Sequence, residues 1–404
     1  MTAPDLPDHW FRHELGRLVS ILSRRFGVHR LALCEDAAQS ALLQATQSWP
    51  SKLPDDPGAW LYRVAHNHVL DELRREKRDE RYLAEVHVEY AQQEVQDDVL
   101  RLLFVCADPA IPPESQLVLA LKTLCGFSTE EIALRLFQSG DAVHKRLQRA
   151  RARLEEHAEI SSIDPGRVHS VLHMLYLLFN EGYSSAQPDR VIRRELCDEA
   201  LRLALMLRND PAGALPETDA LVALMSFHAA RFDARVDGMG GLLLLEEQDR
   251  SRWDPELIRR GLEHLMRSAR GETLSRYHAE AGIAAEHCLA PAYAETDWAE
   301  IVRLYDVLER IAPSPLNVLN RAIALAEWQG PDAGLAALEG FEAPSWLLGY
   351  YLWDATLGEL HRRRGDRDRA LLHIRRALVA APTNPEKALL ERRVRALETG
   401  SGKD

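Results

Sequence analysis

The stretch that decides the fold is residues 126–154, which read GFSTEEIALRLFQSGDAVHKRLQRARARL. Ser128 followed by Glu131 forms a capping box, which predicts that a helix begins here. The segment from Phe137 to Gly140 predicts a turn, and a second helix is expected from about Asp141 to Leu154. Two short helices joined by a tight turn are typical of a helix-turn-helix module.

The second of these helices is strongly basic. Residues 135–153 contain six Lys or Arg and one acidic residue, while Val143 and Leu147 are apolar at a spacing that, with Ala133, predicts a buried side. Such a helix can enter the major groove, with its N-terminal side chains at base edges and its basic side chains at phosphates. A solvated surface helix is the alternative. The candidate DNA-binding residues are Ser139, Asp141, Ala142, His144, Lys145, Arg146, Gln148, Arg149, Arg151 and Arg153.

Another amphipathic helix is predicted from Pro57 onward. An apolar stripe lies beside a row of polar residues on the adjacent face. Ion pairs within a surface helix, such as Asp71 with Arg75, would explain part of the row. Trp49 and Tyr62 are aromatic residues that either stack on an unpaired base or belong to the core. The stripe comprises Leu61, Ala65, Val69 and Leu73, and the row comprises Arg63, Asn67, Asp71, Arg74 and Arg78.

Helical periodicity dominates the chain, so we predict an all-α protein. We expect four segments: a helical domain over 8–82, an acidic linker over 83–100, the helix-turn-helix domain over 101–160, and a long helical region over 167–397. The linker interpretation depends on five acidic residues without a Lys or Arg in 84–100, although an exposed helix would have the same composition. The last boundary is predicted from a cluster of Ser, Asp, Pro and Gly just before the long region.

Composition narrows the class of protein. The chain has 404 residues and a net charge of −12, which argues against DNA covering its whole surface. Its five cysteines are scattered without a C-x-x-C pair, which argues against a zinc ribbon or disulfide framework and fits a reducing cytoplasm. Neither an export signal nor a run of about 20 apolar residues appears, so no membrane association is expected. We predict no cofactor, metal site or catalytic constellation.

The long C-terminal region contains one clear match to the 34-residue tetratricopeptide pattern. When Tyr351 is taken as the first position of the pattern, a glycine stands at position 8 and alanines at positions 20 and 27. An apolar residue stands at position 24 and a proline at position 32. Leu319 to Leu338 is a more degenerate copy. Because one repeat cannot bury its own apolar face, we expect an irregular helical stack across the region. The matching residues are Gly358, Ala370, Ile374, Ala377 and Pro382.

Taken together, these motifs resemble the sigma factors of the extracytoplasmic-function type, which give bacterial RNA polymerase its promoter specificity. Residues 111–133 resemble the start of sigma region 4, and residues 142–154 resemble its −35 recognition helix; Phe137 and Ala142 depart from the usual glycine and threonine. Ala65, Asn67, Asp71 and Arg74 match the Ala-x-Asn-x-x-x-Asp-x-x-Arg pattern of sigma region 2.

The resemblance implies a partner and a role for each segment. The partners would be promoter DNA and the RNA polymerase core, through its β′ clamp helices and β flap. The docking residues would be Glu35, Asp36, Gln39, Leu42 and Leu43. The −10 residues would be Trp49, Arg63, Asn67, Asp71, Arg74, Arg75, Lys77 and Arg78.

The C-terminal region resembles the extension of one class of these factors, in which it is thought to regulate the sigma factor. The resemblance implies a regulatory protein as a further partner, bound by the extension. Several polar and aromatic residues in apolar surroundings could line a ligand pocket, although a structural role is the favoured interpretation. The alternatives for the whole chain are a polymerase-independent helix-turn-helix regulator, a scaffold with a degenerate DNA module and, last, an enzyme. The pocket candidates are Asn180, Glu181, Arg231, Arg235, Asp249, Arg250 and Trp253.

Overall fold

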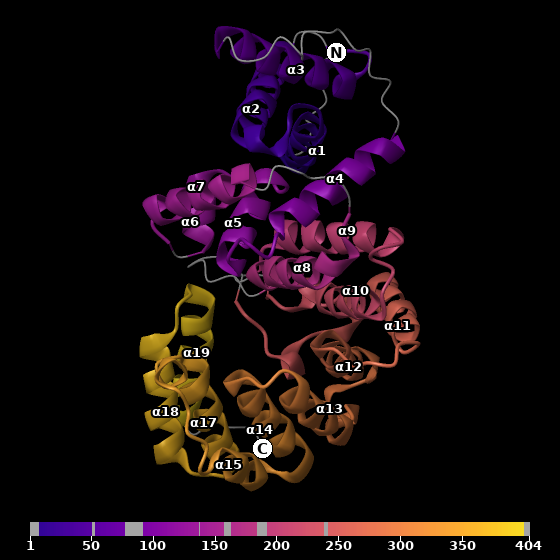
Figure 1. Ribbon diagram of the computed structural model, residues 1–404. Coiled ribbons are helices and arrows are strands. Elements are labelled where there is room, and N and C mark those ends of the chain that lie inside the picture. The colour runs from indigo at the N-terminus through magenta and orange to yellow at the C-terminus, as the bar shows by residue number, and fades with distance from the viewer. Residues whose placement is uncertain are drawn as a thin grey trace. The chain divides into compact units, whose positions relative to one another are not determined.

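The computed structural model describes residues 8–50, 53–76, 92–136, 138–156, 163–183, 192–237 and 241–399. Across these residues every regular element is a helix, apart from one isolated bridge between Val236 and Leu242, which confirms the all-α prediction (Figure 1). The chain forms two compact units. The first comprises Met1–Leu178 and Asp198–Gly213, and the second comprises Phe179–Cys197 and Ala214–Asp404.

The first unit begins with three helices, α1 (Asp8–Phe26), α2 (Leu31–Ser48) and α3 (Pro57–Glu76). The predicted apolar stripe of α3 is buried, from Leu61 at its start to Leu73 near its end. Burial of this stripe fixes the rotation of α3 about its axis, so the adjacent polar row must face outward.

The helix-turn-helix module follows. Its helices are α5 (Pro113–Thr123), α6 (Thr129–Arg135) and α7 (Gly140–Glu156). The predicted capping box is present, with the Glu131 N–H donating to Ser128 Oγ at 3.0 Å and the Ser128 N–H donating to Glu131 Oε2 at 2.8 Å. Ala133, Val143 and Leu147 are buried as predicted, whereas Phe137 of the turn lies outside the described residues.

Helix α4 (Gln92–Cys106) begins inside the segment predicted to be an acidic linker. Asp98 is only 5% exposed, and its Oδ1 accepts hydrogen bonds from Arg24 of α1 at 2.9 Å and from Arg101 at 3.1 Å. The acidic segment therefore includes part of a helix that packs on α1. The Asp98 carboxylate is paired with two arginines, and the apolar residues that follow Asp98 are buried. Residues 83–91 of the predicted linker lie outside the described residues.

Parts of α8 (Val168–Tyr183) and α9 (Arg194–Asn209) complete the first unit. Arg167 donates to Asp108 Oδ2 at 2.7 Å, which ties the start of α8 to the end of α4. On α9, Glu199 is buried and pairs with His13 of α1 at 3.1 Å and with Arg202 at 2.7 Å. The first helices of the C-terminal region are therefore built into the same compact unit as the N-terminal modules.

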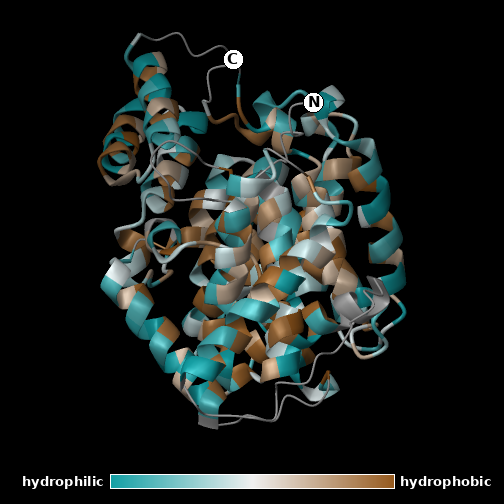
Figure 2. Cartoon of the chain, turned by 90° about the horizontal axis from the view of Figure 1, so that it is seen from above, coloured by the Kyte–Doolittle hydropathy of each residue, from teal (hydrophilic) through white to brown (hydrophobic). Residues whose placement is uncertain are grey.

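The second unit is a curved stack of helical hairpins (Figure 1), in which consecutive helices pack on one another. Figure 2 shows that the helices of the chain carry both hydrophilic and hydrophobic residues, as packing of helix on helix requires. The helices are α10 (Pro216–Ala229), α11 (Pro255–Ser268), α12 (Arg276–Leu289), α13 (Trp298–Ile311), α14 (Pro315–Gln329), α15 (Pro331–Leu338), α16 (Ser345–Leu348), α17 (Tyr351–Arg363), α18 (Arg367–Ala380) and α19 (Asn384–Thr399).

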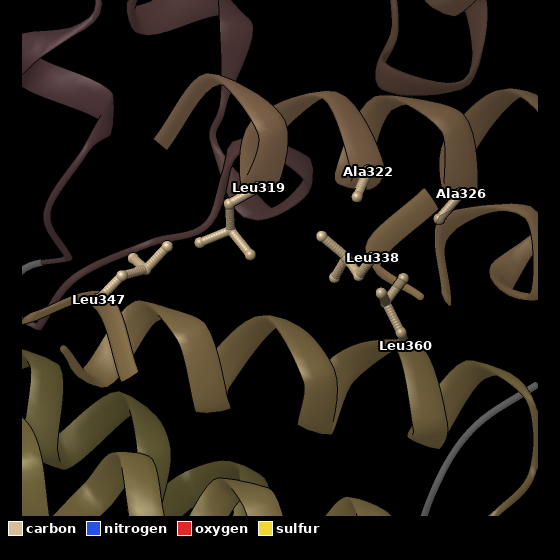
Figure 3. Packing of buried hydrophobic residues seen from close by; sticks show 6 residues of the cluster. All are labelled: Leu319, Ala322, Ala326, Leu338, Leu347 and Leu360. Carbon is tan, nitrogen blue, oxygen red and sulfur yellow. The ribbon is translucent and has the colours of Figure 1, made fainter. Parts of the chain in front are cut away.

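The tetratricopeptide match corresponds to the hairpin of α17 and α18. Ala370, Ile374 and Ala377 are fully buried, and a Cβ atom on Gly358 would lie 2.5 Å from Ile374 Cγ1 and 3.1 Å from its backbone nitrogen. The preceding hairpin supplies the next layer of core, in which Leu338 of α15 lies beside Leu360 of α17 (Figure 3). The predicted stacking of neighbouring repeats is therefore present.

No helix among the described residues is both long and apolar enough to cross a membrane.

Gly358→Ala should destabilise the second unit, because the added methyl group meets Ile374 at the closest approach of α17 and α18. We expect a loss of about 1–3 kcal/mol in the free energy of unfolding, measured by urea titration of the full chain. Gly349→Ala is the matched control, since its nearest atoms lie 3.7 Å or more from the new Cβ and its φ is −88°. Equal effects of the two substitutions would contradict the packing described.

Glu199→Gln should make the first unit less stable at neutral pH. Burial alone would raise the pKa of Glu199, but hydrogen bonds from Arg202 and His13 outweigh it and lower the pKa from 4.5 to about 2. The ionised carboxylate therefore stabilises the fold above about pH 4.5, and this contribution is lost as the pH falls toward 2. We expect a loss of about 2–3 kcal/mol at pH 7 in urea unfolding. Glu114→Gln, on the exposed start of α5, should cause none.

Candidate nucleic-acid interface

Helix α7 presents most of the predicted −35 residues to solvent. Its first turn is capped by Ser139, whose Oγ accepts a hydrogen bond from the Ala142 N–H at 3.2 Å. The buried side of α7 holds Val143, Leu147 and Ala150, so the basic side chains occupy the remaining faces. Ser139, Asp141, His144, Lys145, Gln148, Arg149 and Arg153 are exposed, while Ala142 and Arg146 are half-buried.

The polar row predicted for the −10 site lies on one exposed face of helix α3, as the helical spacing of its residues predicts. Two ion pairs lie along this row, between Arg74 and Asp71 at 3.1 Å and between Arg75 and Glu72. Both pairs are largely exposed and contribute little stability, so the arginines can exchange their carboxylate for a phosphate at small cost. Lys77 lies outside the described residues, as does Arg78. Of the predicted −10 residues on α3, those that are exposed are Arg63, Asn67, Asp71, Arg74 and Arg75.

The prediction that Trp49 belongs to the −10 site is corrected by the structure. Trp49 is 4% exposed, and its ring centroid lies 5.7 Å from that of Trp10, 6.5 Å from that of Phe11 and 5.6 Å from that of Trp60. In this conformation the indole packs against three other rings and presents no open face to an extruded base. Tyr62 is likewise buried. Trp49 is therefore a core residue at the C-terminal end of α2.

Helix α2 divides the predicted docking residues between two environments. Asp36, Gln39 and Leu43 are exposed and share one face at helical spacing, with Leu43 61% exposed. An aliphatic side chain at this exposure, flanked by polar groups, suits a protein-binding surface. Leu42 is buried and helps to hold α2 in place. Of the predicted docking residues, only Asp36, Gln39 and Leu43 are exposed to solvent.

Glu35 is the second correction, because it is buried rather than displayed. Its side chain is 2% exposed; Oε1 accepts a hydrogen bond from Thr123 Oγ1 of α5 at 2.7 Å, and Oε2 pairs with the Arg151 guanidinium of α7. Desolvation raises the pKa of Glu35, an effect that Arg151 and Thr123 partly offset. No local sequence pattern indicates this contact, since the partners of Glu35 lie 88 and 116 residues away.

Two of the three arginines singled out in the C-terminal region, Arg235 and Arg250, donate hydrogen bonds to backbone carbonyls. Arg235 donates to the Tyr183 carbonyl at the end of α8 at 2.8 Å, and Arg250 donates to the carbonyls of His287 and Ala290 at the end of α12 at 2.6 and 2.8 Å. Arg250 also lies over the Trp253 ring at 4.4 Å. A guanidinium at a helix C-terminus satisfies free carbonyls and interacts favourably with the helix dipole. These contacts favour the structural interpretation over a ligand pocket.

The second unit also contains a cavity of about 540 Å³. Tyr293, Trp298 and Tyr305 form an aromatic wall. Its carboxylates and guanidiniums largely pair with one another, as Arg362 does with Glu359 at 2.7 Å. The cavity lining therefore combines an aromatic wall with paired charges. Among the described residues, no group of three or more His, Cys, Asp or Glu side chains is placed to hold a metal ion.

Comparisons with known proteins match three segments of the chain. Residues 10–79 match sigma-70 region 2, residues 109–154 match sigma-70 region 4, and residues 167–269 match a family of unknown function, DUF6596. An uncharacterized protein of Rhizobium meliloti (strain 1021) is 37% identical over 380 residues, which cover 89% of each chain. No solved structure matches. The two sigma-70 matches contain α3 with its exposed polar row and α7 with its basic face.

Proposed function

Because the chain belongs to the extracytoplasmic-function type of the sigma-70 family and carries a C-terminal extension, we propose that it directs bacterial RNA polymerase to specific promoters and that the extension regulates this activity. The observation that carries the proposal is the display of two separate polar rows, on α3 and α7, in the order in which sigma regions 2 and 4 occur. A polymerase-independent regulator would need only the second row.

The proposed division of labour follows from the side chains on each helix. The N-terminal part of α7, from Ser139 to His144, would meet base edges of the −35 element. Arg146 and Arg149 would contact base edges or phosphates farther along the groove. On α3, Asn67 and Arg74 would hold the opened −10 strand, where unstacking costs a few kcal/mol that must be offset by new contacts.

The proposed partner of α2 is the RNA polymerase core. Asp36, Gln39 and Leu43 combine a carboxylate, an amide and an exposed aliphatic group on one face. That combination suits docking onto a helical surface of the polymerase, with Leu43 as the apolar anchor. Promoter binding by the free factor should be weak, because the net charge of −12 opposes association with DNA.

The proposed regulatory role of the extension is supported by exposed aliphatic residues on α16 and α18. Leu348, Leu372 and Val379 are 53%, 50% and 88% exposed, and they border one shallow groove. Exposed aliphatic residues that gather on one face mark a binding surface more often than scattered ones do. We propose that an apolar segment of a regulatory protein binds this groove.

Two pairs of substitutions test the proposed DNA contacts. In transcription with purified core polymerase and genomic DNA fragments of the source organism, the full chain should yield start sites that share a −35/−10 pair. Arg146→Ala with Arg149→Ala should weaken promoter binding by about 10-fold or more, at about 1–3 kcal/mol per contact.

Asn67→Ala with Arg74→Ala should leave initial promoter binding nearly intact but reduce opening of the DNA strands. Strand opening is measured by the reactivity of unpaired thymines with permanganate.

A chain that neither binds core polymerase nor yields new transcripts would instead support the polymerase-independent regulator. Normal transcription from both double variants would refute the residue assignments while leaving the family unaffected.

Leu372→Glu with Val379→Glu tests the role of the extension. Both side chains are exposed, so the charges should not disturb the core, and the purified variant should transcribe as well as the unmodified chain. In the source bacterium, the same variant should change the level of the dependent transcripts, measured by sequencing of RNA 5′ ends. Met266→Glu, another exposed apolar position on α11, is the control. Identical transcript levels in all three strains would contradict a regulatory surface at this groove.

A further inference from the structure

The cavity of about 540 Å³ in the second unit, which we call the extension cavity, has an aromatic corner in its wall. The rings of Tyr293 and Trp298 form this corner, with centroids 5.3 Å apart and planes inclined at 64°. The His287 ring lies 5.3 Å from that of Trp298 and stays uncharged at neutral pH, because burial and the neighbouring Arg231 lower its pKa to about 3. A cavity of this size and lining suits a small ligand with an aromatic ring.

Four of the charged side chains that line the cavity neutralise one another. Arg363 of α17 pairs with Glu327 of α14. Arg362 donates two hydrogen bonds to the Glu359 carboxylate, at 2.7 and 3.0 Å. Such two-point contacts between guanidinium and carboxylate are among the strongest in proteins. The charges of these two pairs are therefore balanced without a ligand.

Two further charged side chains of the lining, Arg393 and Glu246, lack such a partner. Among the described residues, no acceptor lies within hydrogen-bonding distance of the Arg393 guanidinium, and Glu359, 3.6 Å away, is already bonded to Arg362. In the same part of the chain, no ion pair or hydrogen bond reaches the Glu246 carboxylate. Burial and Glu359 raise the pKa of Glu246, while Arg393 opposes them. One guanidinium and one carboxylate are thus available to a ligand.

The spacing of these two groups is fixed by a contact between their backbones. Glu246 lies on a short 3-10 helix, Leu245–Glu247, and Arg393 lies on α19. Arg392, next to Arg393, donates to the Leu242 carbonyl at 3.1 Å and so ties α19 to the segment that carries Glu246. No ion pair joins Glu246 to Arg393, although the structure describes both. The two opposite charges are therefore held apart, and a ligand that carries both charges can bridge them.

We propose that the extension cavity binds a free amino acid with an aromatic side chain, whose ammonium group pairs with Glu246 and whose carboxylate pairs with Arg393. The side chain of the ligand occupies the aromatic corner. A zwitterion supplies both missing charges and adds no net charge to a lining of three carboxylates and three guanidiniums. The site goes beyond the proposed function and does not depend on it, because every group that it uses lies in the second unit.

Calorimetric titration of the full chain tests the ligand class. L-phenylalanine, L-tyrosine and L-tryptophan are the probes, and we expect saturable binding of at least one. For L-phenylalanine, two analogues each lack one charge: phenethylamine has no carboxylate, and 3-phenylpropanoate has no ammonium group. Each analogue should bind at least about ten-fold more weakly than the amino acid, because it leaves one charged group of the site unpaired. An analogue that binds as tightly as its amino acid overturns the proposal.

Substitutions assign each charge of the ligand to its partner. Glu246→Gln should weaken binding of the amino acid by about ten-fold and leave 3-phenylpropanoate unaffected, because that analogue never uses Glu246. Arg393→Gln should likewise leave phenethylamine unaffected. A merely structural role would change all ligands together. Glu295→Gln, which removes an exposed carboxylate outside the lining, is the matched control. Glu246 is exposed, so its variant decides the test even if Arg393→Gln does not fold.

Chemical protection locates the ligand. Ile323→Cys places a thiol at an exposed position of the lining, while the five native cysteines are buried. The bound amino acid should slow its alkylation by iodoacetamide and leave Val379→Cys, 88% exposed and outside this cavity, unaffected. Absence of saturable binding, equal binding by Glu246→Gln, or unprotected Ile323→Cys overturns the site. Transcription with core polymerase tests the proposed function separately, so failure of either leaves the other standing.

Discussion

Close packing of helix on helix is the constraint on which the rest of this structure depends. Across the described residues no strand pairs with another beyond a single bridge, so each helix must bury its apolar stripe against neighbouring helices. Such packing requires small residues where two helices approach most closely. Gly358 opposite Ile374 and Gly16 opposite the Leu124 carbonyl meet this requirement in the two units. The same rule therefore shapes the repeat stack and the sigma modules.

Burial of the apolar stripes determines which side chains of α3 and α7 are exposed to solvent. In α3, burial of Leu61 to Leu73 leaves Asn67 and Arg74 facing solvent, and in α7 burial of Val143 and Leu147 leaves the basic residues outside. Both rows stand on rigid helices, not on loops, so their spacing is set before a ligand arrives. A row of side chains on a helix suits the regular spacing of phosphates and bases. Because the helix already fixes the backbone, less conformational entropy is lost when the row binds.

The sequence predicted local features well and long-range ones poorly. The capping box of Ser128 and Glu131, the stripe of α3 and the repeat hairpin at Gly358 follow from spacing alone, and the structure confirms them. Glu35, Asp98 and Trp49 were misplaced for one reason. A carboxylate or an indole on an amphipathic helix has the same local pattern whether it meets water or a partner, and their partners come from other helices.

The two classes of ion pair in the first unit have different physical consequences. The exposed pair of Arg74 with Asp71 is weak, so DNA can replace it without a structural change. In the pair of Glu35 with Arg151 the carboxylate is buried, and removing one partner would leave it unpaired in a medium that solvates it poorly. Such a pair gives little net stability when both charges can instead reach water together. Breaking it one partner at a time is therefore costly, and the pair holds α2 and α7 in one defined arrangement within the first unit.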